Sequence, residues 1–228
     1  SSVSQKCIKI LNPTITTQVG DMSRIPVEVK GDYKESVDSK VEDAIQLSQR
    51  DWDSFETSWD YKKHPLLRNV SRISEAFIQW QAECDDRFNR LKANEEELNR
   101  IFIDIYGLQD ELTPEVEDKD VTVRKADLQR DIKSLLSYAV GCMFGRYSLD
   151  VEGLAYAGGE WDSSKYQSYI PDADNVIPIT DEEYLDDDIV SRLCAWLKAV
   201  YGADTLEANL DYICLLYTSP SPRDTERS

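Results

Sequence analysis

The chain has 228 residues, with 44 acidic against 26 basic side chains and a formal net charge of −18. That length is enough for one or two domains with a buried core. The excess of acids argues against a surface that binds nucleic acid directly, because such affinity comes from Lys and Arg side chains that neutralise phosphates. Two interpretations of the acidity stay open: a well-solvated cytoplasmic protein, or an acidic surface that docks a basic partner.

The cysteines and the hydropathy pattern indicate a cytoplasmic protein. Five cysteines are scattered without a Cys-x-x-Cys pair, which predicts reduced thiols rather than a metal knuckle or a disulfide framework. The longest apolar run, from Leu135 to Phe144, is too short to cross a bilayer, so no membrane association is expected. Only nine residues are glycine, which favours a mainly α fold.

The first 30 residues predict a short β or loop segment, because Cys7–Thr14 is β-biased and Pro13 interrupts it. A helix is expected from Ser36 to Arg50. Beyond it, aromatic residues recur at intervals of three and four, which would place them on one side of a helix. They are Trp52, Phe55 and Trp59. A base-stacking platform is one interpretation. Core anchors are favoured, since acids between the rings would repel phosphate.

The centre of the chain predicts two long amphipathic helices. The first runs from Ile73 to Tyr106, about 50 Å at 1.5 Å per residue, and Gly107 ends it. The second runs from Arg124 to Phe144. Both carry an apolar stripe, and we expect the segments around Leu98 and Leu135 to pack against each other. The predicted fold is therefore mainly α, a long antiparallel helical hairpin plus shorter helices, with a β or loop remnant at the N-terminus.

The second long helix also carries the most basic surface of the chain. Its cations are Arg124, Lys125, Arg130 and Lys133. A phosphate contact, if the chain makes one, is expected here, although salt bridges to the preceding acidic helix are the favoured use. The single histidine, His64, has no second His or nearby Cys and is a poor candidate for a metal ligand.

The last third predicts turns and shorter helices. Gly158-Gly159 lacks the Lys, Ser or Thr that a phosphate-binding loop would place after it, so a plain turn is expected. Thr180 and Glu183 form a capping box for a helix that Gly202 ends. A short helix is expected from Thr205 to Ile213. From Cys214 onward the amino-acid sequence resembles a translated sequencing adapter. We therefore expect that residues 214–228 do not pack against the preceding helices.

Two stretches carry a family resemblance: Glu96–Leu108, and Gly141-Cys-Met-Phe-Gly-Arg-Tyr-Ser-Leu-Asp-Val-Glu-Gly-Leu-Ala-Tyr-Ala157. They closely resemble the region after the catalytic domain in BREX-type (bacteriophage exclusion) adenine-specific DNA methyltransferases. The resemblance covers about Asn12 to Ile213. It implies that residues 1–30 close a catalytic domain and that 31–213 form a helical spacer between catalytic and target-recognition parts. Residues 214–228, from their likeness to an adapter, are expected to be foreign.

The resemblance implies a parent protein that transfers a methyl group from S-adenosylmethionine to adenine in phage defence. Its expected partners are DNA, through the parent protein, and other BREX components. The chain itself offers no catalytic, cofactor-binding or metal residue. Asn12-Pro13-Thr14 departs from the Asn-Pro-Pro-Tyr motif, whose aromatic ring stacks the flipped base, and predicts an ordinary turn. We therefore expect the chain alone to be inactive.

A second hypothesis comes from a different functional class. An acidic helical chain without an active site is also typical of a protein-interaction module, which would dock other defence proteins or mimic the charge of DNA. The sequence upstream of the chain would separate the two hypotheses, because only a methyltransferase would encode the Asn-Pro-Pro-Tyr motif there.

Overall fold

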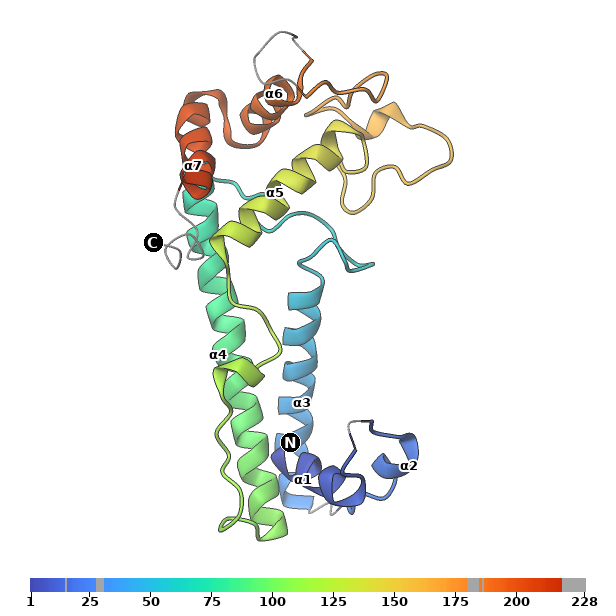
Figure 1. Cartoon of the computed structure of the whole chain (residues 1–228), viewed down its shortest axis with the longest axis vertical. Coiled ribbons are helices and arrows are strands. Elements are labelled where there is room, and N and C mark those ends of the chain that lie inside the picture. Colours follow the sequence, from blue (N-terminus) through green and yellow to red (C-terminus); the bar gives the residue numbers. More distant parts are fainter. Residues whose placement is uncertain (15, 28–30, 180–184, 186, 219–228) are drawn as a thin grey trace, which may run out of the picture. The chain divides into compact units, whose positions relative to one another are not determined.

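The computed structural model describes residues 1–14, 16–27, 31–179, 185 and 187–218, and within these ranges it contains helices and no strand (Figure 1). The expectation of a mainly α fold is thereby confirmed. The chain divides into two compact units. Unit 1 comprises Ser1–Trp52 and Cys84–Lys125, and unit 2 comprises Asp53–Glu83 and Ala126–Ser228.

Both units are built from helices joined by irregular segments. Unit 1 contains α1 (Ser2–Leu11), α2 (Val19–Met22), α3 (Gly31–Trp52), the second part of α4 (Ile73–Tyr106) and the 3-10 turn η1 (Asp118–Asp120). Unit 2 contains the first part of α4, α5 (Leu128–Met143), η2 (Ser163–Lys165), α6 (Ile189–Tyr201), η3 (Ala203–Thr205) and α7 (Leu206–Thr218).

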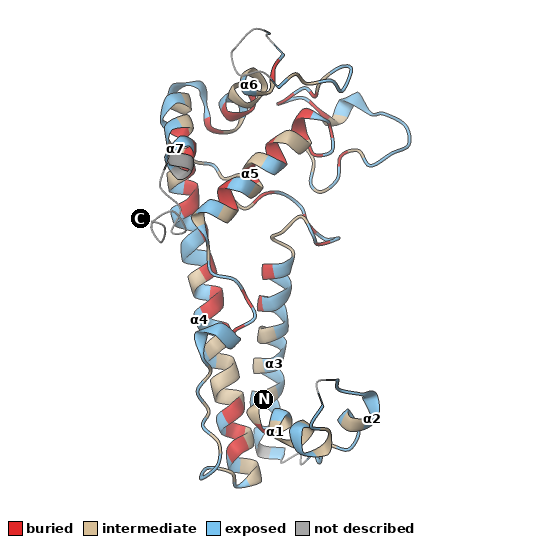
Figure 2. Cartoon of the chain, in the orientation of Figure 1, coloured by how far each residue is buried: buried red, intermediate tan, exposed pale blue. Residues whose placement is uncertain are grey.

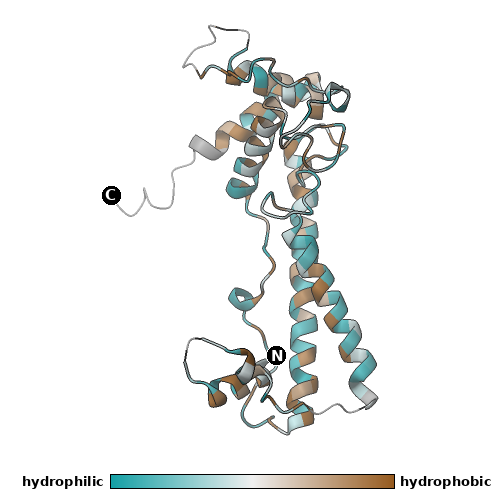
Figure 3. Cartoon of the chain, turned by 90° about the vertical axis from the view of Figure 1, so that its right-hand side faces the viewer, coloured by the Kyte–Doolittle hydropathy of each residue, from teal (hydrophilic) through white to brown (hydrophobic). Residues whose placement is uncertain are grey.

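Helix α4 has the bounds that the sequence predicts. Buried residues recur along it (Figure 2), and hydrophobic and hydrophilic residues alternate along the same helix, the longest in Figure 3. Gly107 ends it at a φ of 65°. The amide of Leu108 donates to the Ile103 carbonyl at 3.0 Å, and that of Gly107 donates to Asp104 at 3.3 Å. This pair of bonds is a Schellman motif, which satisfies carbonyls that the helix end leaves open.

The core of unit 1 shows which element pairs with α4. Leu47 of α3 packs with Phe88 and Leu91 of α4, and the extended residues Val121 and Val123 complete the cluster. Helices α3 and α4 run in opposite directions (Figure 1). Helix α4 therefore has an antiparallel neighbour in unit 1, and that neighbour is α3.

The expected pairing of the segments around Leu98 and Leu135 stays a prediction, because the two segments belong to different units. Leu98 is half-buried on α4 in unit 1. Leu135 is 0% exposed on α5, which contacts α6 within unit 2. Helical spacing identifies an apolar stripe correctly, but it contains no information about which element covers that stripe.

The N-terminal segment is helical, which corrects the prediction of a β or loop remnant there. Residues Ser2–Leu11 form α1, with the Ser1 hydroxyl accepting a hydrogen bond from the Ser4 amide. The Ser2 amide donates to the Asn99 side chain at 2.8 Å, and Lys6 pairs with Glu111. A capping group and contacts with the α4 region outweigh the weak β preference of this stretch, because such preferences depend strongly on context.

The aromatic residues after α3 do not share a helix face. Helix α3 ends at Trp52, and the residues from Asp53 to Tyr61 form turns. Trp52 is 53% exposed and Trp59 is 100% exposed. The interpretation of both as core anchors is therefore wrong, because the spacing of three and four has meaning only where the backbone is helical.

Helix α5 begins four residues later than the sequence predicts. Asp127 caps it, and its carboxylate accepts a hydrogen bond from the Arg130 amide at 2.7 Å. A capping carboxylate satisfies an amide that has no partner within the helix, so the helix starts where such a residue stands. Arg124 and Lys125 consequently lie in the extended segment before α5 and not on it.

The C-terminal helices agree in part with the sequence. The predicted capping box at Thr180 and Glu183 lies outside the described residues. The described helix α6 is capped by Asp188 and ends at Gly202, as expected. Helix α7 extends to Thr218, beyond the predicted end at Ile213. Cys214 and Leu215 are exposed, and residues 219–228 lie outside the described residues.

We predict that Leu135→Asp unfolds unit 2. The substitution places a carboxylate where the side chain is fully buried, which should cost at least about 3 kcal/mol of unfolding free energy. Leu154→Asp is the matched control, because Leu154 is 53% exposed in the same unit and should change stability by no more than about 0.5 kcal/mol. Chemical denaturation measures both, and equal stabilities of the two variants would contradict the placement of Leu135.

Candidate functional site

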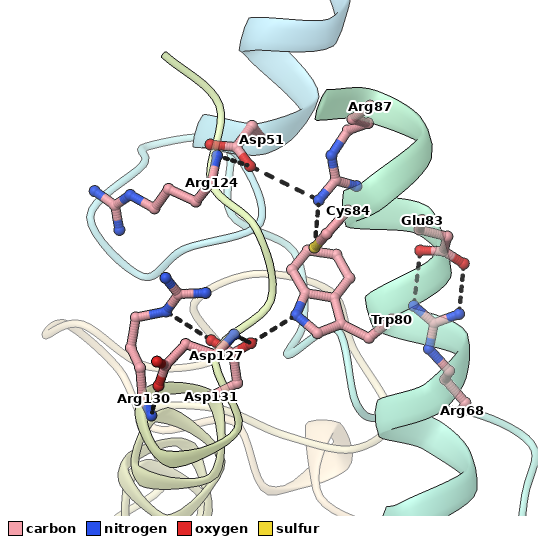
Figure 4. A network of polar contacts seen from close by, with 10 residues as sticks. All are labelled: Asp51, Arg68, Trp80, Glu83, Cys84, Arg87, Arg124, Asp127, Arg130 and Asp131. Atoms are coloured by element: carbon pink, nitrogen blue, oxygen red, sulfur yellow. Dashed lines mark hydrogen bonds and ion pairs between the residues drawn. The ribbon is translucent and has the colours of Figure 1, made fainter. Parts of the chain in front are cut away.

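Asp51 and Arg87 are largely buried at the end of α3 and on α4, within unit 1. The guanidinium lies 3.7 Å from the carboxylate and 3.2 Å from the Cys84 sulfur (Figure 4). The same carboxylate oxygen, Oδ1 of Asp51, accepts a hydrogen bond from the Arg124 amide at 3.3 Å. A buried charge is tolerated only when it is paired and hydrogen-bonded. These contacts join α3, α4 and the extended segment, and their role is structural.

Asp131 forms the corresponding network in unit 2. It is 3% exposed and accepts hydrogen bonds from Trp80 Nε1 at 3.0 Å, the Asp127 amide at 3.1 Å and Arg130 Nε at 2.7 Å (Figure 4). Three donors occupy the carboxylate, so it connects α4 to the start of α5. With its acceptor capacity taken up by these donors, Asp131 is a poor candidate for a general base.

The four cations expected near a phosphate are divided between the units. Arg124 and Lys125 belong to unit 1, whereas Arg130 and Lys133 belong to unit 2. Whether any of them contacts a phosphate stays a prediction.

Two of these cations are engaged by neighbouring groups. Lys125 Nζ donates to Asp118 at 3.0 Å and lies 4.1 Å from the centre of the Phe88 ring. Hydrogen bonds from Lys92 and Lys125 hold the pKa of Asp118 below its usual value. Arg130 bonds Asp131, and its guanidinium lies 5.6 Å from the Phe55 ring. Lys133 is exposed.

The Asn12-Pro13-Thr14 sequence forms an ordinary turn, as predicted. The Asn12 side-chain oxygen accepts hydrogen bonds from the Thr14 amide at 3.1 Å and the Thr14 hydroxyl at 2.5 Å. Its amide nitrogen donates to Asp21 at 2.7 Å. The functional groups of Asn12 are thus used locally, in the manner typical of Asn in turns. Gly158 and Gly159, both at positive φ, likewise lie in an exposed bend.

His64 is buried within a cluster of aromatic rings in unit 2. Its Nδ1 accepts a hydrogen bond from the Leu66 amide at 3.3 Å, and its ring centre lies 6.1 Å from that of Tyr138. Tyr138 stacks on Tyr147 at 4.7 Å, and Tyr61 meets both rings edge-on. Burial lowers the pKa of His64 to about 3, so the ring is neutral at pH 7.

Sequence reasoning did not find this cluster, although twelve tyrosines were a signal of aromatic packing. Burial also raises the pKa of the neighbouring Cys142 thiol to about 12, which makes it unreactive as a nucleophile at neutral pH. The cluster is consequently a core and not a catalytic centre.

Across the part of the chain that the structure describes, no three His, Cys, Asp or Glu side chains are grouped so as to hold a metal ion. Over the same residues, no helix combines the length and the apolar character needed to span a bilayer.

We predict that His64 makes stability depend on pH. Its folded pKa lies below the unfolded value of about 6.5, so the unfolded state binds the proton first and stability falls as the pH drops below 6.5 toward 3. His64→Asn keeps an acceptor for the Leu66 amide but cannot titrate. The unfolding free energy of the wild type minus that of the variant should fall by about 1 kcal/mol per pH unit below pH 6. A constant difference from pH 7 to pH 5 would contradict this prediction.

The comparisons with known proteins agree with the resemblance seen in the sequence. The chain is 48% identical over 221 residues to a protein of Lacticaseibacillus casei (strain Zhang) named adenine-specific methyltransferase PglX, covering 93% of this chain and 18% of that protein. It is 30% identical over 237 residues to adenine-specific methyltransferase BrxX of Escherichia coli O9:H4 (strain HS), covering 92% and 19%. No protein-family model matches the chain. The chain therefore spans less than a fifth of the length of these curated relatives.

Proposed function

We propose that this chain is a helical region of an adenine-specific DNA methyltransferase of the PglX type, acting in BREX phage defence. The observation that carries the proposal is the 48% identity to PglX over 93% of the chain. The parent protein would transfer a methyl group from S-adenosylmethionine to adenine in DNA, with the cofactor held outside this chain. Within the described residues, side chains that could do chemistry, such as Asp131 and Cys142, are instead committed to the core.

We further propose that residues 1–30 close the catalytic domain, that 31–213 form the helical spacer, and that 214–228 are adapter-derived. The start of α3 at Gly31 and the exposure of Cys214 and Leu215 support this division. Removal of residues 214–228 is expected to leave the melting temperature within about 2 °C of that of the full chain, because a foreign tail contributes no selected contacts. A larger decrease would contradict the proposed boundary.

The spacer role relies on the continuity of α4. A helix of 34 residues is about 50 Å long, and its hydrogen-bonded backbone resists bending, so it can hold other parts of the parent protein at a fixed distance. Glu83 and Cys84, where the helix passes from one compact unit to the other, lie in its interior. Loss of helical stiffness at this point should impair methylation without removing any core contact.

A chimaera tests the spacer role. The segment of Lacticaseibacillus casei PglX that aligns with this chain is replaced by residues 1–213, and adenine methylation of host DNA is measured by sequencing. Methylation is expected to persist, and its loss while the chimaera is folded would contradict the proposed function. In the same chimaera, glycine at the exposed positions Gln81 and Ala82 should reduce methylation severalfold, because each glycine costs a helix about 1 kcal/mol.

The matched control for the chimaera places glycine at Asn89 and Ala93. These positions are also exposed on α4, but they lie within unit 1, where α3 packs against the helix. The control is expected to methylate more than the Gln81 and Ala82 variant. Equal methylation by both glycine pairs would show that stiffness at the unit boundary is not what matters.

The chain alone is expected neither to bind S-adenosylmethionine nor to methylate DNA, since its sequence contains no glycine-rich cofactor loop and no Asn-Pro-Pro-Tyr motif. Isothermal titration calorimetry of the 228-residue chain with S-adenosylmethionine measures this directly. A dissociation constant in the micromolar range would overturn the prediction and would point to a cofactor site within these helices.

The acidic charge supports a second candidate, a helical module that binds a basic protein without catalysis. Its basis is the net charge of −18. The two candidates differ in a measurable way. A pull-down with other BREX components that succeeds equally with an inactive parent protein favours the module, whereas an upstream Asn-Pro-Pro-Tyr motif favours the methyltransferase.

A further inference from the structure

The segment between α5 and α6 encloses a pocket of about 440 Å³ within unit 2. Its aromatic and larger apolar lining residues are Phe144, Tyr156, Trp161, Tyr166, Ile170 and Pro171, and Ser163, Asp172, Ala173 and Asn175 complete the lining. Trp161 is 51% exposed and Ile170 is 63% exposed. An apolar concavity with several rings is the typical form of a ligand site, and neither the resemblance nor the spacer role accounts for it.

The Trp161 side of the pocket is fixed by packing. The Trp161 and Tyr166 rings are stacked, with centres 4.6 Å apart, and Tyr156 meets Trp161 edge-on at 5.3 Å. Tyr166 donates its hydroxyl proton to the Gly145 carbonyl at 2.5 Å. Gly145 has a φ of 75°, and a Cβ there would lie 2.8 Å from the Trp161 ring. At this positive φ and this close to the indole a side chain would be strained, so glycine suits the position.

Another part of the pocket lining is held in place by Asp172. Its carboxylate pairs with Arg192 and accepts hydrogen bonds from the Asp174 amide at 3.2 Å and the Val176 amide at 3.3 Å. The Asp172 amide donates to the Met143 carbonyl at 2.8 Å. This turn is thus tied to the end of α5.

The charge around the pocket selects the kind of ligand. Glu160 and Asp162 flank Trp161 in sequence, and Asp174 follows the lining residue Ala173. Three basic residues lie close by: the Lys165 ammonium donates to the Ala155 carbonyl at 3.0 Å, Arg192 pairs with the lining residue Asp172, and Arg146 lies beside the lining residues Phe144 and Tyr156. Aromatic faces and carboxylates both attract cations. The same carboxylates repel the phosphates that accompany a nucleobase in DNA.

We infer that this aromatic pocket binds the guanidinium group of an arginine side chain from a partner protein. A guanidinium is flat, stacks on indole and is only weakly hydrated, so it fits an aromatic wall better than an ammonium does. The net charge of −18 favours the approach of a basic partner. The acidic chain thereby acquires a specific point of contact, whichever part of a larger protein it belongs to.

The test uses the 228-residue chain with labelled tryptophan side chains and a short peptide, acetyl-Gly-Arg-Gly-amide. Nuclear magnetic resonance follows the indole signal of Trp161 during the titration. The signal is expected to shift with the arginine peptide, and the same peptide with neutral citrulline should bind at least about tenfold more weakly. Adenosine is titrated in parallel. Equal binding of the citrulline peptide, binding of adenosine alone, or no shift at all would overturn the inference.

Two lysine variants separate the pocket from the overall charge. Ile170→Lys puts a cation beside the rings and should weaken the binding of the arginine peptide at least about tenfold. Ile78→Lys is the control, because Ile78 is 64% exposed in the same unit, is absent from the pocket lining and undergoes the same change in charge. Both side chains are largely exposed, so both variants should keep the wild-type melting temperature. Equal weakening by the two variants would show attraction by overall charge and contradict a pocket.

Discussion

The burial of the apolar side of α4 is the constraint on which both compact units depend. A 34-residue helix with this composition is not stable alone in water, because helical stability in proteins comes mainly from the packing of an apolar face. Different elements provide that packing. In unit 1, Phe88 and Leu91 pack with α3 and an extended segment. In unit 2, Ile73 is anchored through its amide to Asn209, and Trp80 is anchored through its indole to Asp131.

Buried polar groups make these contacts specific. Asp51 and Asp131 each sit where several donors converge, and removing any partner would leave a carboxylate without full compensation in a dry environment. Apolar packing alone would tolerate small shifts of one helix along another. A carboxylate that needs particular donors does not tolerate them, so the network fixes the register of α5 and α3 on α4.

The pairing of basic with acidic side chains inside the chain also bears on function. Basic side chains that could have met a phosphate also pair with carboxylates of the same chain, as Lys125 does with Asp118 and Arg130 with Asp131. The acids remain in excess over the whole chain. Under the proposed function, such a region would position other parts of a methyltransferase and meet basic protein surfaces, whereas its excess of acids disfavours direct contact with DNA phosphates.

The sequence by itself predicted the features that depend on interactions between residues close together in the chain. The bounds of α4, its glycine stop at Gly107, the turn at Asn12 and the resemblance to adenine-specific methyltransferases were all readable without coordinates. Only the tertiary structure showed which element packs against the apolar side of each helix. It also showed that Trp59 is exposed and that the Trp161 ring lies against Gly145. The reason is that periodicity and capping act over a few residues, whereas the choice of partner depends on shape and on donors far away in sequence.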